Sequence, residues 1–214
     1  MSGATMARRV TVVDHGLGNV DSVCRALEEA GAVVRLAASP AEVRDAARLV
    51  LPGVGAFRDG MRGLRARGLD DALRAACGAG VPLLGICLGM QLLAERGTEG
   101  GEEPGLGFVP GEVRRLVAHP GERVPHVGWN EVHPCAPARA GLLRDLPGGA
   151  DVYFVHSYHL VPADPAHIVA TTPYAGGFVS VVSPAPNIHG VQFHPEKSQH
   201  AGRLLLRTFV EGRC

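Results

Sequence analysis

The sequence predicts an α/β fold, in which a central, mostly parallel sheet has helices on both faces and carries an added antiparallel portion. In the first half of the chain, short apolar runs alternate with helical patterns, as they do in β-α-β units. The run 81–86 (VPLLGI) is apolar throughout, which is typical of a strand buried on both faces of a parallel sheet. After Arg96 the chain becomes glycine-rich and then mostly strand-like, which favours antiparallel strands in the second half.

The elements of the first half follow from these apolar runs and from the glycines that separate them. The turn 16–18 (GLG) separates the first expected strand from the first helix, and the segment 52–55 (PGVG) closes the third strand. The strands are expected at 10–14, 33–37, 49–51 and 81–86, and the helices at 20–30, 40–47, 69–78 and 88–95.

The second half is expected to begin with a loop at 97–107, which is rich in glycine and acidic residues. Strands are then expected at 111–117, 151–161, 168–172, 178–182 and 188–193, followed by a final helix at 199–212. Neither an internal repeat nor a low-complexity linker divides the chain, so residues 1–214 are expected to form a single domain.

The composition excludes several classes of protein. Hydrophobic residues make up 46% of the chain and charged residues 20%, which excludes a disordered or fibrous protein. The formal net charge is zero, so no electrostatic argument favours nucleic acid or an anionic membrane surface as a partner. No apolar stretch approaches the roughly 18 residues of a membrane-spanning helix, and we expect a cytoplasmic protein.

The five cysteines predict neither a disulfide framework nor a metal site. Their number is odd, they are widely spaced, and they include no C-x-x-C pair and no Cys/His grouping at zinc spacing. We therefore expect no metal and no cofactor. What remains is whether one cysteine lies where a thiolate can react.

The segment 85–89 (GICLG) is the strongest local signal, because it lies where a buried strand meets a helix. It has the form of a nucleophile elbow with cysteine as the nucleophile. The flanking glycines permit the strained backbone that such a turn imposes on Cys87. The start of the helix favours a thiolate, and the amide of Leu88 is placed to donate to an oxyanion. A buried structural cysteine is the alternative, which we retain for Cys24 and Cys77.

A thiolate nucleophile needs a base, and His194 is the best candidate among the ten histidines. It ends an expected strand, and side chains two residues apart on a strand share a face, so Glu196 can orient its imidazole. His119 and His133 also precede prolines, but neither has an acid two residues later. We interpret these two as loop or surface histidines.

The segment 52–55 (PGVG) directly follows the third expected strand. Ligands of parallel sheets gather beyond the carboxyl ends of the strands, where the elbow also lies. The backbone amides of this segment could complete an oxyanion hole, and an ordinary β-turn is the alternative.

Five motifs span nearly the whole chain. They are 52–60 (PGVGAFRDG), 85–93 (GICLGMQLL), 125–132 (PHVGWNEV), 153–158 (YFVHSY) and 190–198 (GVQFHPEKS). Together they resemble the class I glutamine amidotransferase family and, within it, the HisH-type subunit of imidazole glycerol phosphate synthase. The resemblance implies a flavodoxin-like α/β amidotransferase domain. Three positions depart from the family's usual residues: His15, Gly97 and His189.

The resemblance also implies roles for individual residues. Cys87 would attack the carboxamide carbon of glutamine, with His194 as acid and base and Glu196 orienting it. The oxyanion region is matched by Gly53, Val54 and Leu88. The positions that hold the amino-acid portion of glutamine are matched by Gln91, Glu99, His156, Ser157 and Tyr158.

A partner protein is implied by the same resemblance. In this subfamily the glutaminase forms a heterodimer with a cyclase subunit, whose barrel conducts ammonia to its own active site. There imidazole glycerol phosphate and AICAR form in histidine biosynthesis. Asn19, Trp129 and Lys197 match positions that face the cyclase.

Other interpretations remain open. A paralogous glutaminase subunit would feed ammonia to another synthase, and a free-standing cysteine amidase would use the same nucleophilic chemistry. A binding or regulatory subunit could keep the fold and lose the chemistry, although the intact Cys87, His194 and Glu196 speak against it.

Overall fold

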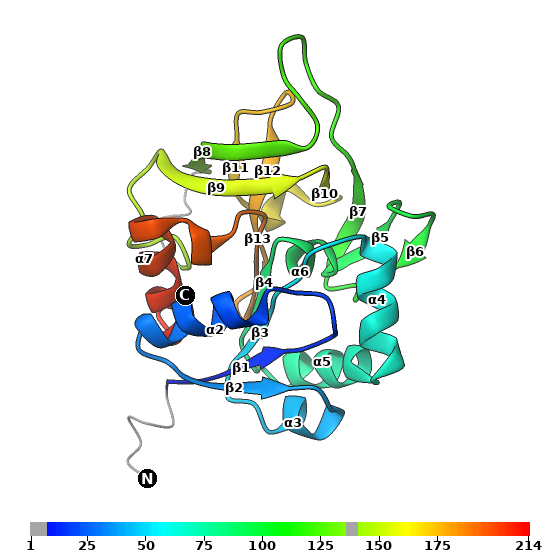
Figure 1. Ribbon diagram of the computed structural model, residues 1–214, viewed down its shortest axis with the longest axis vertical. Coiled ribbons are helices and arrows are strands. Elements are labelled where there is room, and N and C mark those ends of the chain that lie inside the picture. The colour runs from blue at the N-terminus through cyan, green and yellow to red at the C-terminus, as the bar shows by residue number, and fades with distance from the viewer. Residues whose placement is uncertain (1–7, 136–140) are drawn as a thin grey trace.

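The strands form two sheets. The computed structural model describes residues 8–135 and 141–214. Within these residues, the larger sheet has nine strands in the order β2-β1-β3-β4-β13-β12-β11-β8-β9, and the smaller sheet has four in the order β10-β7-β5-β6. The larger sheet extends from β2 at the bottom of Figure 1 to β8 and β9 near the top.

The strands differ widely in length. Those of the larger sheet are β1 (Arg9–Val13), β2 (Val33–Ala37), β3 (Leu49–Leu51), β4 (Leu83–Ile86), β8 (His126–Pro134), β9 (Ala150–His156), β11 (Ile168–Thr172), β12 (Phe178–Ala185) and β13 (Ile188–Val191). Those of the smaller sheet are β5 (Ala94–Gly97), β6 (Glu103–Pro104), β7 (Val109–Arg115) and β10 (Tyr158–Pro162).

Neighbouring strands β2, β1, β3, β4 and β13 pair in parallel. The interior strands β3 and β4 are buried on both faces of the sheet, as β3 illustrates. Leu49 and Leu51 join one apolar cluster, and Val50 joins the cluster on the opposite face. This two-sided burial explains why these strands are apolar throughout instead of alternating with polar residues.

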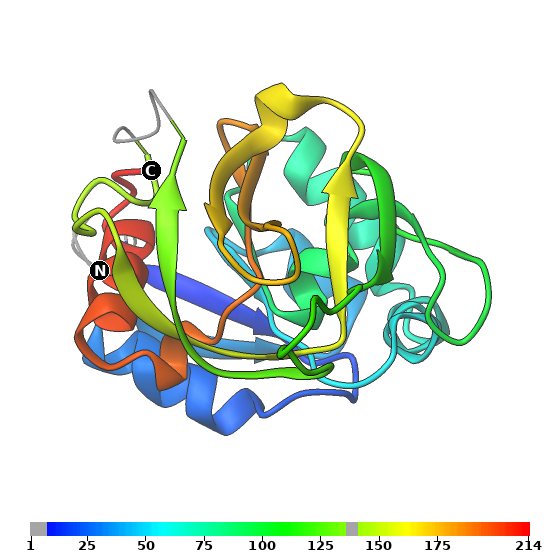
Figure 2. The ribbon, with the colours of Figure 1, turned by 90° about the horizontal axis from the view of Figure 1, so that it is seen from above.

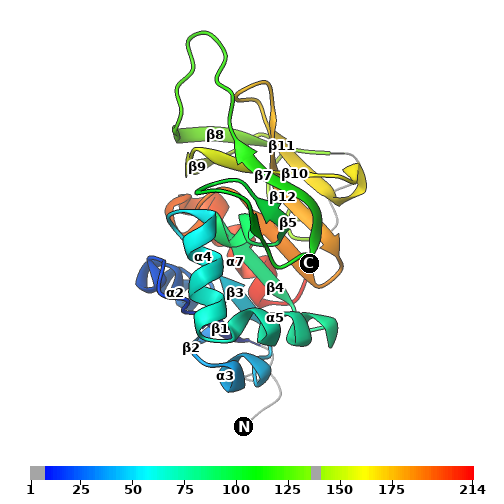
Figure 3. The ribbon, with the colours of Figure 1, turned by 90° about the vertical axis from the view of Figure 1, so that its right-hand side faces the viewer.

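Helices cover both faces of these parallel strands. Leu27 of α2 (Val20–Glu29) and Leu205 of α7 (Gln199–Val210) belong to one apolar cluster. Leu64 of α4 (Phe57–Ala66) and Leu73 of α5 (Leu69–Gly78) belong to the other. Figure 1 places α2 and α7 on one side of the sheet, and Figure 3 looks onto the side covered by α4 and α5. The predicted α/β fold class is confirmed. Among the described residues, no helix is both long and apolar enough to cross a membrane.

The helices are short. They are α2 (Val20–Glu29), α3 (Pro40–Arg44), α4 (Phe57–Ala66), α5 (Leu69–Gly78), α6 (Leu88–Gln91) and α7 (Gln199–Val210), with 3₁₀ turns η1 (Pro165–His167) and η2 (Pro195–Lys197).

Beyond β13, strands β12, β11, β8 and β9 pair in antiparallel fashion. Figure 2 looks down on β8 and β9, which lie above the parallel strands. Strand β9 ends at His156 and β10 begins at Tyr158, yet these two strands belong to different sheets. The single strand expected at 151–161 is therefore two strands, and the chain passes from one sheet to the other at Ser157.

The structure differs from the expected elements at other points. The helix expected at 88–95 ends at Gln91, because the next residues pair as β5 with β7, and this tertiary pairing overrides local helix propensity. The expected loop at 97–107 contains the short strand β6. The sequence patterns predict neither β8 nor α4, whose interior glycines lower helix propensity. In α4 a Cβ on Gly63 would overlap the His15 carbonyl oxygen, so this glycine is needed for packing.

Candidate active site

Cys87 lies in the turn between β4 and α6, at the carboxyl end of the parallel strands. Its backbone has φ 54° and ψ −110°, which L-residues rarely adopt, and its amide donates to the Val191 carbonyl at 2.8 Å. A Cβ on Gly85 would come within 2.7 Å of the Gly89 carbonyl oxygen, and a Cβ on Gly89 would overlap the Leu51 carbonyl oxygen. The close packing of strand, turn and helix therefore requires both glycines.

His194 and Glu196 follow β13 and form a buried pair. His194 Nδ1 lies 2.7 Å from Glu196 Oε1, and the side chains are only 4% and 3% exposed. The strand ends earlier than expected, at Val191, so the pair meets through the 3₁₀ turn η2 and not through strand alternation. Ser198 Oγ donates to the His194 carbonyl at 2.7 Å and accepts from a backbone amide of β9 at 3.0 Å, which ties this turn to the antiparallel strands.

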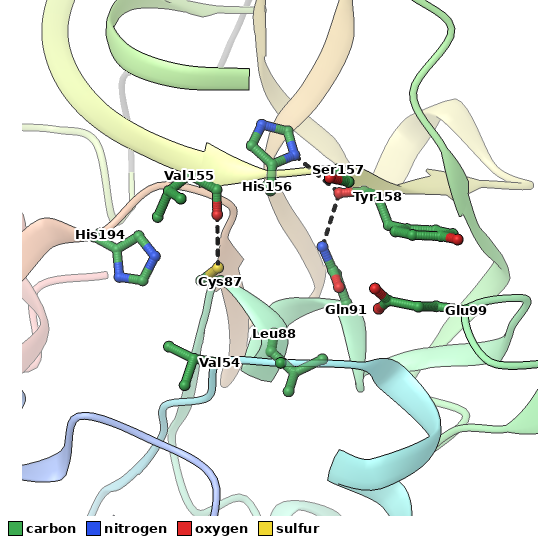
Figure 4. A pocket seen from close by; sticks show the side chains of 11 residues that line it. Val54, Cys87, Leu88, Gln91, Glu99, Val155, His156, Ser157, Tyr158 and His194 are labelled. Carbon is green, nitrogen blue, oxygen red and sulfur yellow. Dashed lines mark hydrogen bonds between the residues drawn. The ribbon is translucent and has the colours of Figure 1, made fainter. Parts of the chain in front are cut away.

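The neighbours of His194 favour its charged form. Burial alone lowers the pKa of His194, but the interactions with Cys87 and Glu196 outweigh burial and raise it to about 10. Nε2 is buried and has no hydrogen-bond partner among the described residues. Figure 4 shows the ring beside the Cys87 sulfur, where it can exchange a proton with a reacting group.

A cavity of about 80 Å³ lies over Cys87. Its walls come from the elbow, from the 52–55 segment and from the junction of β9 and β10 (Figure 4). It is lined by Val54, Gly55, Cys87, Leu88, Gln91, Glu99, Val155, His156, Ser157, Tyr158 and His194. The structure thus brings together nearly all residues predicted for the nucleophile, the oxyanion region and the substrate pocket. Gly53 does not line the cavity, since it packs behind the Leu88 side chain.

Polar groups connect the cavity wall to the sulfur. Gln91 Nε2 donates to the Tyr158 carbonyl at 2.8 Å and to Gln192 Oε1 at 3.0 Å. Gln192 Nε2 lies 3.8 Å from the Cys87 sulfur, and the thiol lies 4.0 Å from the Val155 carbonyl oxygen. The sulfur is therefore held between a donor and an acceptor.

Glu99 contributes a carboxylate to the same cavity. Its Oε2 accepts from the Phe57 amide at 3.0 Å, at the start of α4. Burial raises the pKa of Glu99, while the hydrogen bond from Phe57 acts in the opposite direction.

The three residues predicted to face a partner lie beyond His194. Asn19 and Lys197 line a second hollow together with His194, which lines both hollows. Lys197 Nζ lies 5.7 Å from the centroid of the Tyr153 ring, and Trp129, which is 48% exposed, packs edge-on against that ring at 6.0 Å. Tyr153 therefore links Trp129 to Lys197.

A sequence model of the glutamine amidotransferase class-I family matches residues 11–211. The chain belongs to the class I glutamine amidotransferase family. The "Imidazole glycerol phosphate synthase subunit HisH" of Moorella thermoacetica is 46% identical over 204 residues, which cover 95% of each chain. The protein of the same name from Salinibacter ruber is 48% identical over 205 residues, covering 94% of this chain and 93% of that one.

Solved structures resemble this amidotransferase at lower identity. A crystal structure of a glutamine amidotransferase has a TM-score of 0.74 and 19% identity, covering 95% of this chain and 98% of that chain. The structure of PurLQS from Thermotoga maritima has a TM-score of 0.71 and 18% identity, covering 92% of this chain and 94% of that chain. At such identities the likeness concerns the fold, and the predicted amidotransferase fold is confirmed.

Two contacts of the Cys87 sulfur in this amidotransferase, with Gln192 and Val155, are not predicted from the sequence. Gln192 lies two residues before His194 in the same motif, so the alternation argument could have found it. Val155 acts through its backbone carbonyl, which leaves no signal in the sequence. The buried Cys77 remains a structural cysteine, because burial raises the pKa of its thiol to about 12.

His15, one of the departures from the family's usual residues, lies behind the 52–55 segment of this amidotransferase. Its side chain is buried, and Nε2 donates to the Pro52 carbonyl at 2.8 Å. Burial lowers the pKa of His15, which keeps the ring neutral. His15 thus fixes the start of the segment without adding a charge near Cys87.

Proposed function

We propose that this chain is the glutaminase subunit of an imidazole glycerol phosphate synthase. It hydrolyses glutamine to glutamate and ammonia through a cysteine thioester. The ammonia passes to a cyclase subunit, which forms imidazole glycerol phosphate and AICAR in histidine biosynthesis. The observation that carries the proposal is the elbow at Cys87, which shares a cavity with the buried pair of His194 and Glu196. Identities of 46% and 48% to HisH subunits support this choice of synthase.

In the proposed reaction the Cys87 thiolate attacks the carboxamide carbon of glutamine. The His194 imidazolium gives its proton to the departing nitrogen, the C–N bond breaks, and a thioester and ammonia form. Water then attacks the thioester, His194 takes a proton from that water, the C–S bond breaks and glutamate leaves. Glu196 holds the imidazole in the orientation that both steps need and stabilises its positive charge.

The residues around the sulfur suit the other parts of glutamine. Gly53, Val54 and Leu88 form the proposed oxyanion region. Leu88 is the first residue of α6, so its amide has no partner within the helix and can donate to the oxyanion. The amino-acid portion is held by Gln91, Glu99, His156, Ser157 and Tyr158. The Glu99 carboxylate suits an ammonium group, and backbone amides of the 157–158 turn suit a carboxylate.

The proposed partner is a cyclase subunit with a barrel fold, which docks on Asn19, Trp129 and Lys197 to form a heterodimer. All three residues are exposed. The same side of the molecule exposes apolar side chains on paired strands, where Val127 of β8 lies opposite Val155 of β9. Exposed apolar side chains rimmed by polar ones are typical of protein interfaces. We further propose that residues 1–214 act as one amidotransferase domain in the cytoplasm.

Glutamine turnover with and without the partner tests this proposal. The lone subunit is expected to be a poor glutaminase, and a cyclase subunit loaded with its substrate or product analogue should raise turnover strongly. The reason is that ammonia released without an acceptor is protonated in water and wasted. Lys197→Ala should weaken assembly or ammonia transfer. Arg207→Ala, at an exposed position of α7, is the control and should leave both unchanged.

Two outcomes would contradict the proposed function. Equal rates for the mixture and for the lone subunit, or no complex by gel filtration, would leave a free-standing cysteine amidase as the better account. Activation by a different synthase subunit, but not by the cyclase, would identify a paralogous glutaminase.

A further inference from the structure

His126 and His156 form a buried pair, of which His156 lines the cavity and His126 does not. They lie opposite each other on β8 and β9, and His126 Nδ1 is 3.1 Å from His156 Nε2. His15, His189 and His194 are also buried, but each leaves one ring nitrogen without a hydrogen-bond partner among the described residues. In the His126–His156 pair, all four ring nitrogens have partners.

These partners fix where the protons lie. A backbone carbonyl only accepts, so His156 Nδ1, 2.9 Å from the Tyr158 carbonyl oxygen, carries a hydrogen. In a neutral imidazole the other nitrogen then accepts, so His126 Nδ1 donates to His156 Nε2. His126 Nε2 in turn accepts from the side-chain amide of Asn130 at 3.4 Å. Both rings are therefore Nδ1–H tautomers.

Aromatic side chains keep both rings neutral. The His126 ring is stacked on Tyr174 and Phe154, with centroid distances of 4.0 Å and 5.0 Å. Phe178 contacts the His156 ring at 4.8 Å. Burial lowers the pKa of His126, and it lowers the pKa of His156 to about 3. Neither ring is charged at neutral pH.

The Tyr158 carbonyl connects this pair to the Cys87 sulfur. It accepts a second hydrogen bond, from Gln91, as Figure 4 shows. Gln91 also donates a hydrogen bond to Gln192, whose amide nitrogen contacts the sulfur. Ser157, which precedes this carbonyl group in the chain, also lines the cavity. Fixing the carbonyl therefore fixes both the 157–158 turn and the orientation of the Gln91 amide.

We propose that His126 and His156 are positioning residues of the glutamine pocket. As neutral Nδ1–H tautomers they hold the Tyr158 carbonyl, and so they set the place of the 157–158 turn that binds the amino-acid portion of glutamine. The role in glutamine binding rests on the proposed function. The tautomers rest on the contacts of the two rings alone.

The tautomers can be measured without an enzyme assay. In protein labelled with ¹⁵N-histidine, ¹⁵N–¹H correlations of the rings distinguish a protonated Nδ1 from a protonated Nε2. Signals that disappear in the His126→Gln and His156→Asn variants are assigned to the His126 and His156 rings. At pH near 7 both rings should be neutral Nδ1–H tautomers. An Nε2–H tautomer or a charged ring at either position would overturn the proposal.

Two variants of His156 separate the hydrogen bond from the filling of space. Asparagine places its amide nitrogen where His156 Nδ1 lies, whereas leucine has nearly the same shape as asparagine and no donor. We expect the KM for glutamine to rise about tenfold in His156→Leu and about threefold or less in His156→Asn, with kcat changing less than KM in both. His133→Leu, at an exposed position of β8, is the control and should keep the wild-type KM.

The outcomes separate this proposal from the proposed function. Equal KM values for His156→Leu and His156→Asn in an active enzyme would refute the positioning role and leave the glutaminase intact. A wild-type complex without glutaminase activity would refute the proposed function, and the pocket role with it. Circular dichroism checks the fold of each variant, and if His156→Leu does not fold, the comparison is made between His126→Leu and His126→Asn, with the same expected order.

Discussion

At the elbow the backbone holds Cys87 in place, whereas across the cavity side chains hold the 157–158 turn. Helix α6 packs so closely on strands β3 and β4 that neither Gly85 nor Gly89 leaves room for a Cβ. The opposite wall depends on the hydrogen bonds of His126 and His156. The two regions face each other over one cavity, but they should respond to different perturbations.

A wall that is held by backbone packing is sensitive to added volume and insensitive to pH. A wall that is held by neutral histidines should tolerate substitutions that keep the hydrogen-bond donor, and it should respond to acid, because protonation of a buried imidazole is costly. We call the wall that depends on His126 and His156 the histidine wall. Variants that add volume to the elbow, or that remove a titrating group from the histidine wall, therefore test this contrast.

The largest effect is expected for Cys87→Ala. Because the glycines and not the sulfur hold the elbow, this variant should keep the fold and lose glutamine hydrolysis altogether. Purified protein is assayed with glutamine and the partner, and circular dichroism checks the fold. Cys77→Ala is the matched control, since Cys77 is buried but does not line the cavity, and this variant should keep activity. Activity above a few per cent in Cys87→Ala would contradict the assignment.

A smaller but clear effect is expected on stability when a methyl group is added to the elbow. Gly89→Ala forces a Cβ against the Leu51 carbonyl and should lower the free energy of unfolding by about 3 kcal/mol or more. Gly78→Ala is the control, because nothing lies within 4 Å of its Cβ position, and it should change stability by less than about 1 kcal/mol. Urea unfolding measures both. Equal losses would show that backbone packing does not hold the elbow.

The smallest effect is expected from acid at the histidine wall. The unfolded chain binds a proton at His156 near its ordinary pKa of 6.5, but burial lowers the folded-state pKa to about 3. The stability contributed by the neutral ring is therefore present above pH 6.5 and is lost as the pH falls toward 3. His156→Asn removes this titration.

Urea unfolding at several pH values measures the slope of stability against pH. Between about pH 4.5 and 6, this slope should be smaller in His156→Asn than in the wild type by about 1 kcal/mol per pH unit. An unchanged slope would mean that His156 takes up its proton equally in both states. The histidine wall would then be no more sensitive to acid than the elbow.

The sequence predicts the elbow well because its causes lie within a few neighbouring residues. The glycines around Cys87 and the apolar run before it are adjacent in the chain. The contact between His194 and Glu196 was also predicted, although through strand alternation and not through the 3₁₀ turn that creates it. Helix α4 is not predicted, because its two interior glycines lower the helix propensity of the segment. The reason for these glycines, close packing against other elements, becomes visible only in the structure.

The histidine wall is not predictable from the sequence, because the two histidines that form it are distant from each other in the chain. His126 and His156 are thirty residues apart, and only the register of β8 with β9 brings them together. The carbonyl of Tyr158 that they hold is common to every residue type, so no sequence pattern marks it. The relation between Trp129 and Lys197 is equally hidden in the sequence, because each of them contacts the ring of Tyr153 from a different part of the chain.

His194 borders both the cavity over Cys87 and the hollow that contains Asn19 and Lys197. In the proposed reaction, the His194 imidazole therefore separates the side that binds glutamine from the side that faces the synthase. In this proposal, substitutions on the first side should alter which amide is accepted, and substitutions on the second side should alter which protein receives the nitrogen. A glutaminase built in this way can be transferred among synthases during evolution, while the chemistry at the sulfur stays the same.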